Sequence, residues 1–172
     1  MVEAVVDRIE ASCIFSDDKL FLRRLAYVES NDGLQPDTYR DGYHGGIWQM
    51  DEAMYDETRT STAGYLLLEY FKGINRYFGI DWMSTTWEDL RMPLYSGLGA
   101  RLYIQLKAKD TVIPRPIEEQ GIFWEVYYRP GGDPQDFVTA AEQLEQGCHH
   151  GNGPDMVFVI DGSGSIGTSN FV

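Results

Sequence analysis

Cysteine and histidine are scarce in this chain, which has only 2 cysteines and 3 histidines in 172 residues. Cys13 and Cys148 stand near the two ends of the predicted domain. They fit either two buried thiols, as in a cytosolic protein, or one bridge that closes nearly the whole domain, as in a secreted protein. We favour the bridge, which would stabilise the fold by about 4 to 5 kcal/mol in the chain-entropy model. No histidine has a cysteine or carboxylate at a recognised zinc spacing, so we expect no metal site and no cofactor.

Long apolar runs are also missing. No stretch approaches the length of a membrane span, and the first residues, Met1-Val2-Glu3-Ala4, lack the basic start and apolar run of a secretory leader. The protein is therefore either intracellular, or secreted with a leader that this sequence does not include. We favour the second, extracellular, location.

Basic residues are outnumbered, with 14 Lys and Arg against 27 Asp and Glu, for a net charge of −13. This charge opposes binding to nucleic acid and to anionic membranes, and it slows the approach to an anionic bacterial wall at low salt. A neutral glycan meets no such repulsion. We therefore expect neither nucleic acid nor a membrane as partner.

What the chain does contain is typical of one folded domain: 43% hydrophobic and 13% aromatic residues. Its apolar periodicity predicts a mainly α fold. Gly97 and Gly99 indicate a close helix–helix approach, because each glycine otherwise weakens its helix by about 1 kcal/mol. We expect a short turn capped by Ser84 or Thr85, and helices over residues 2–12, 17–29, 50–59, 63–78, 94–108, 117–128 and 133–146.

Glu29 ends the apolar stripe of the second predicted helix. Phe21, Leu25 and Glu29 recur every four residues and so share one face. A carboxyl group in apolar surroundings holds its proton more tightly, as a general acid requires. The alternative is a glutamate that only borders the core.

The residues after Glu29 strengthen the first interpretation. Glu29-Ser30 is followed by Gly45-Gly46-Ile47-Trp48-Gln49, and Asp41 and Asp51 flank that segment 12 and 22 positions after Glu29. Together they resemble the catalytic core of the goose-type lysozyme and soluble lytic transglycosylase superfamily. The resemblance implies a lysozyme-like helical domain over residues 1–147, with a small irregular or hairpin segment lining its cleft.

The resemblance also implies roles for the acidic residues. Glu29 would protonate the glycosidic oxygen, and Asp41, Asp51 or both would position and activate a water on the opposite face of the sugar, as in an inverting glycosidase. The two aspartates favour hydrolysis over the transglycosylase reaction, which needs the glutamate alone. The alternatives are a loop carboxylate for Asp41 and a helix cap for Asp51.

Four further residues are candidates for the substrate site. Ser30 is expected to hydrogen-bond within the turn and support the site, while Trp48, Gln49 and Tyr128 are candidates to line the cleft. Trp48 fits the core equally well, and Tyr128 fits a helix-end aromatic packed on the core. Arg129-Pro130 departs from the family's usual residues after the tyrosine.

The character of the chain changes after the domain. Residues 148–154 are predicted to form a linker in which His149 and His150 are solvated. Residues 155–172 contain a buried-strand pattern followed by Asp161-Gly162-Ser163-Gly164-Ser165, which resembles the opening of a von Willebrand factor A domain, whose Asp-x-Ser-x-Ser loop suits Mg²⁺. The later ligands are absent, so we expect no metal here. The resemblance implies part of a larger extracellular adhesion or matrix protein.

The sequence thus predicts a secreted glycoside hydrolase for β-1,4-linked aminosugar polymers, either peptidoglycan or chitin-like. The alternative is a catalytically silent glycan-binding or structural module with extracellular matrix partners. An enzyme should place Glu29 at the base of an open groove, facing an aspartate about 6.5 to 9.5 Å away. A filled groove favours the silent module.

Overall fold

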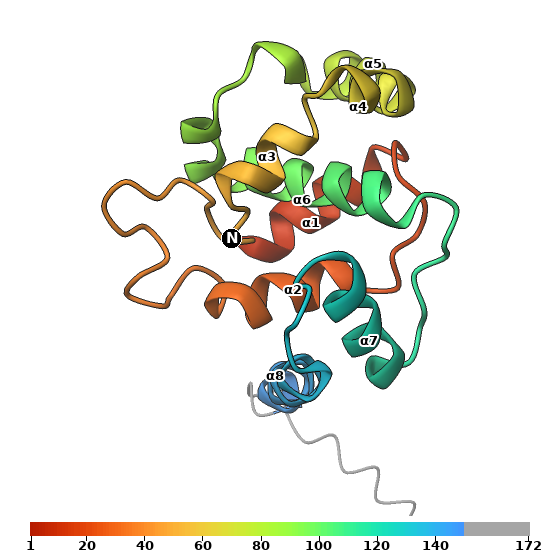
Figure 1. The fold of residues 1–172 in the computed structure, drawn as a ribbon. Helices are drawn as coiled ribbons and strands as arrows, with labels where there is room; N and C mark the ends of the chain where they lie inside the picture. The colour runs from red at the N-terminus through yellow and green to blue at the C-terminus, as the bar shows by residue number, and fades with distance from the viewer. Residues whose placement is uncertain (150–172) are drawn as a thin grey trace, which may run out of the picture.

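The computed structural model in Figure 1 describes residues 1–149, which confirm the helical class. These residues form eight α-helices and two short 3₁₀ helices, with no strand among them. The segment between α2 and α3 is irregular, so the hairpin alternative is wrong. The elements are α1 Val2–Ala11, α2 Phe21–Ser30, α3 Glu52–Glu57, α4 Ser61–Leu66, α5 Leu68–Phe78, η1 Trp82–Ser84, η2 Trp87–Arg91, α6 Pro93–Ala108, α7 Ile117–Tyr127 and α8 Pro134–His149.

Helix α6 is the centre of the domain and contacts α1, α2, α3, α7 and η2 (Figure 1). The predicted close helix–helix approach is confirmed at Gly97, whereas the nearest neighbour of Gly99 lies in the loop before α3. A Cβ atom on Gly97 would lie 2.9 Å from the Ile9 side chain, and one on Gly99 would lie 2.8 Å from the sulfur of Met50. Glycine at both positions lets the Ile9 and Met50 side chains pack directly on the α6 backbone.

Helix α2 begins at Phe21, four residues later than predicted. The Asp17 carboxylate accepts a hydrogen bond from the Lys19 backbone N–H at 2.9 Å, and this local turn competes with helix. The N-cap of α2 is Leu20, and the Asp18 carboxylate, two residues before it, accepts from the Leu22 N–H at 3.1 Å.

Other boundaries were also predicted imperfectly. The single helix expected over 63–78 is broken at Leu67, whose side chain is buried while its backbone leaves helical geometry. The helix expected over 50–59 is the shorter α3. Thr86, rather than Ser84 or Thr85, caps η2 in a capping box with Asp89.

The last helix, α8, continues to His149, two residues beyond the predicted domain end. The rest of the predicted linker and the von Willebrand-like start, residues 150–172, lie outside the described residues.

Cys13 is exposed and carries a free thiol; its proposed partner Cys148 has no described side chain, and the described residues contain no disulfide. Within residues 1–149, no helix has the length and apolar character needed to cross a membrane.

Candidate active site

Glu29 lies in the last turn of α2, at the end of a fully buried apolar stripe. Phe21 and Leu25 have no exposed surface, and the Glu29 side chain is 6% exposed. The spacing of four residues thus places the carboxyl group against the core, as the sequence predicts. A carboxyl group in this position needs hydrogen-bond partners, because an unpaired buried charge is costly.

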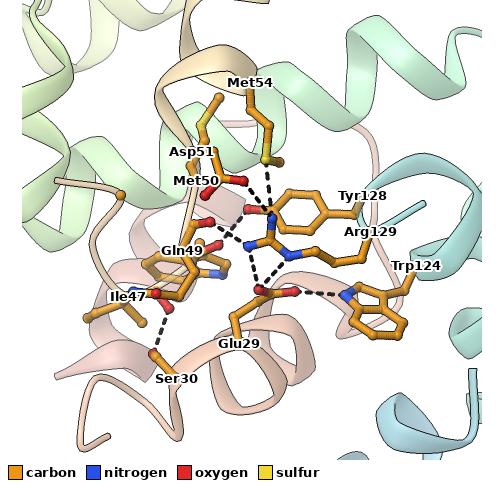
Figure 2. A network of polar contacts seen from close by, with 12 residues as sticks. Glu29, Ser30, Ile47, Gln49, Met50, Asp51, Met54, Trp124, Tyr128 and Arg129 are labelled. Atoms are coloured by element: carbon orange, nitrogen blue, oxygen red, sulfur yellow. Dashed lines mark hydrogen bonds and ion pairs between the residues drawn. The ribbon is translucent and has the colours of Figure 1, made fainter. Parts of the chain in front are cut away.

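Both oxygens of Glu29 have such partners (Figure 2). Oε1 accepts from the indole Nε1 of Trp124 at 2.7 Å. Oε2 accepts from Nε and Nη2 of Arg129 at 2.9 and 2.7 Å. All three partners are N–H donors, so the arrangement is that of an ionised carboxylate, which can only accept.

Arg129 stands at the turn that follows α7 and connects Glu29 to the loop before α3. Its Nη1 donates to Asp51 Oδ2 at 3.4 Å and lies 3.5 Å from the sulfur of Met54. Its Nη2 also donates to the Gln49 carbonyl. The guanidinium therefore occupies the space between the two carboxylates, as Figure 2 shows.

Asp51 occupies the N-cap position of α3, yet its side chain makes no capping hydrogen bond. Its Oδ1 instead accepts from the Tyr43 hydroxyl at 3.0 Å, and the side chain remains 54% exposed. The helix-cap alternative therefore does not account for the direction of this carboxylate.

The separation of the two carboxylates follows from the guanidinium between them. Glu29 binds the Nε–Nη2 edge, and Asp51 binds the nitrogen at the opposite corner. The guanidinium therefore keeps the two carboxylates out of direct contact. An inverting glycosidase needs a gap of about 6.5 to 9.5 Å between its carboxyl groups for the attacking water.

Burial and charge act in opposite directions on Glu29. Burial raises the pKa of its carboxyl group above the ordinary value, while the charge and hydrogen bonds of Arg129, and the Trp124 indole, oppose that rise. For Arg129, burial lowers the pKa of the guanidinium, but the charges of Glu29, Tyr128 and Asp51 and the hydrogen bond to Glu29 together outweigh it and raise the pKa. The proton affinity of Glu29 thus depends on where the Arg129 guanidinium lies.

Ser30 supports this arrangement in the way the sequence predicts. Its buried hydroxyl donates to the Ile47 carbonyl at 2.6 Å and accepts from the Gly33 N–H at 2.8 Å. It therefore joins the end of α2 to the loop that carries Asp51.

The predicted cleft-lining residues lie beneath the site or hold its loop together. Trp48 is fully buried and donates from Nε1 to the Leu22 carbonyl at 2.9 Å, so the core alternative is correct for it. Tyr128 is 1% exposed and donates to the Trp48 carbonyl at 2.7 Å, again as a core residue. The Gln49 amide donates to the Thr38 and Gly46 carbonyls and so closes the loop on itself.

Asp41 is not part of the cluster. It is exposed in the loop and makes none of the hydrogen bonds or ion pairs that the described residues form with Glu29 or Asp51. The structure thus brings only one of the two predicted aspartates to Glu29.

Sequence reasoning missed Trp124 and Tyr43 as site residues, and it treated Arg129 only as a departure from the family pattern. Trp124 had a usable signal, since it precedes Tyr128 by four positions and therefore shares its helix face. Arg129 had no such signal, because its contact with Glu29 joins residues that are 100 positions apart in the chain.

The site is filled by Arg129 and is not an open groove. The open groove expected of an enzyme is therefore not observed, and this outcome favours the silent module. Hollows on the described part of the domain lie elsewhere, for example beside Asp18 and Arg101 or beside Leu20 and Leu144, and Glu29 does not line them. Residues 1–149 contain no group of three or more histidine, cysteine or acidic side chains placed to hold a metal ion.

No protein-family model, curated protein or solved structure matches this chain. Any function proposed for this chain therefore depends on the residues of the cluster themselves.

Proposed function

We propose that this domain hydrolyses β-1,4-linked aminosugar polymers with inversion at the anomeric carbon. One observation carries the proposal: a buried carboxyl, Glu29, and a half-exposed one, Asp51, contact the same guanidinium, and an inverting glycosidase likewise uses a pair of carboxyl groups. The resemblance of the Glu29-Ser30 and Gly46-Ile47-Trp48-Gln49 segments to goose-type lysozymes supports the same chemistry.

The two carboxyl groups differ in the way that the reaction needs. Glu29 is the general acid, because burial favours its protonated form. Asp51 is the general base: its exposed side chain can reach a water on the far face of the sugar, and the Tyr43 hydroxyl holds one of its oxygens. Asp41, which lies outside the cluster, has no part in this mechanism.

The charge of the chain favours an uncharged substrate. With −13 net charge, the protein is repelled by anionic peptidoglycan at low salt, whereas chitin-like polymers are neutral. We therefore place chitin-like glycans ahead of peptidoglycan. Secretion and attachment to a larger matrix or adhesion protein belong to the same proposal.

A second candidate function is the silent glycan-binding or structural module. The observation in its favour is the closed site, in which both Glu29 oxygens are hydrogen-bonded and the side chain is 6% exposed. In such a module, the ion pair between Glu29 and Arg129 would be purely structural.

The experiment that tests the enzyme proposal compares two exposed aspartates of the same region. Asp51→Asn should lower the rate of chitin-hexamer cleavage by about 100-fold or more, whereas Asp41→Asn should stay within about twofold of wild type. Proton NMR of the fresh products should show the α anomer. Equal loss in the two variants, or a β-anomeric product, would refute the assignment of Asp51.

A further inference from the structure

Arg129 makes unequal contacts with the two carboxylates that it joins. It donates two hydrogen bonds of 2.9 and 2.7 Å to Glu29, and a single one of 3.4 Å to Asp51. Charge-assisted N–H···O bonds are ordinarily about 2.7 to 2.9 Å long. A displacement of about 0.5 to 1 Å would therefore loosen the Glu29 pair and complete the Asp51 pair.

The surroundings of the guanidinium suit such a displacement. On the Asp51 side it meets the sulfur of Met54, and methionine is an adaptable neighbour. The chain after it runs through Gly131, whose backbone φ is +85° and around which a Cβ atom would meet nothing within 4 Å. Nη2 of Arg129 also donates to the carbonyl of Gln49, a residue of the loop that carries Asp51.

A general acid must carry a proton when the glycosidic bond breaks, and Glu29 as it stands only accepts hydrogen bonds. We infer that Arg129 is the positioning residue that controls the proton of Glu29: its guanidinium holds Glu29 ionised before substrate binds, and releases Glu29 by moving onto Asp51. This inference rests on the proposed function for its catalytic meaning. The contact between Arg129 and Glu29 that it concerns does not depend on catalysis.

The protons balance over one turnover. Glu29, once released, takes a proton from solvent water and gives it to the glycosidic oxygen as the bond to the anomeric carbon breaks. Asp51 takes one proton from the attacking water, whose oxygen bonds to that carbon. Asp51 then returns its proton to solvent, so one water is consumed and both carboxyl groups are restored.

The direct test follows the Trp124 indole N–H by NMR between pH 4 and 9, because this group donates to Glu29 and reports its ionisation. Arg129→Gln should move the titration midpoint to higher pH, since a cation that opposes protonation is removed. Arg129→Lys should leave the midpoint close to wild type. Glu29→Gln should abolish the transition and so identifies it.

A double-mutant cycle tests the movement towards Asp51. If Asp51 competes for the guanidinium, Asp51→Asn should lower the midpoint in the wild-type background and have a smaller effect in the Arg129→Gln background. An equal effect in both backgrounds would mean that Asp51 acts on Glu29 only through space, and it would overturn the inference.

The activity profile separates this inference from the proposed function. In an active enzyme, Arg129→Gln should shift the alkaline limb of kcat/KM to higher pH, and Arg129→Lys should restore it. A shifted midpoint without hydrolysis by any variant would refute the proposed function and leave the control by Arg129 intact. Hydrolysis with an unmoved midpoint would refute the control by Arg129 alone.

Discussion

Gly46 is the position at which one methyl group should most disturb the loop that carries Asp51. Its φ is +65°, and a Cβ atom would lie 1.9 Å from the Leu90 carbonyl oxygen and 2.8 Å from the Ser96 side chain. Gly42, in the same loop, has φ +71° but nothing within 4 Å of its Cβ position. An alanine at either position would thus have an unfavourable positive φ, but only an alanine at Gly46 would also clash with its neighbours.

The magnitudes follow from this difference. An alanine in the left-handed region costs about 1 to 2 kcal/mol, which is the whole expected effect of Gly42→Ala. Overpacking against fixed neighbours adds about 1 to 3 kcal/mol, so Gly46→Ala should destabilise the fold by about 2 to 5 kcal/mol. The Leu90 contact is a backbone atom and cannot turn aside, which favours the upper part of that range.

Urea unfolding of both variants, followed by tryptophan fluorescence, measures the two free energies of unfolding. The midpoint of Gly46→Ala should fall clearly below that of Gly42→Ala at an unchanged m-value. Equal midpoints would show that the loop does not pack on η2 and α6 as described, and the position of Asp51 would then have to be revised.

Three further predictions concern single side chains. Ser30→Ala should cost about 1 to 3 kcal/mol in urea unfolding, because it removes the buried hydrogen bond that joins α2 to the loop at Ile47 and the part-buried one from the Gly33 N–H; a neutral result would remove its supporting role. The raised pKa of Glu29 means that the folded state binds its proton more tightly than the unfolded state does, so its contribution is fully present below about pH 4.5 and is lost as the pH rises through the folded pKa. The stability of wild type relative to Glu29→Gln, measured from pH 4 to 8, should therefore fall with increasing pH, and a rise would show that the Arg129 ion pair outweighs burial. Cys13→Ser should change stability by less than about 0.5 kcal/mol under reducing conditions, because the thiol is exposed; a larger loss in thermal unfolding would reveal a buried role for it.

The sequence predicts best what depends on local spacing. Phe21, Leu25 and Glu29 recur every four residues, which places the carboxyl group against the core, and Pro93 marks the start of α6. The start of α2 was missed because a side-chain turn at Asp17 competes with the first helical residues.

The contents of the site depend on tertiary contacts that spacing does not encode. Trp48 packs in the core, where Gly97 leaves room for its ring. Arg129 reaches Glu29 only once α7 has packed near the end of α2. A residue that seemed to depart from a family pattern is therefore the central cation of the cluster.

The decisive assay for glycoside hydrolysis is the release of reducing ends from chitin oligomers and from peptidoglycan by wild type and Glu29→Gln. It should be made at low and at moderate salt, because the charge of −13 hinders approach to an anionic wall. Wild type should cleave the neutral oligomers, and Glu29→Gln should lose about 100-fold or more of that activity. Wild-type protein that is folded by circular dichroism and releases no reducing ends from either polymer would contradict this prediction.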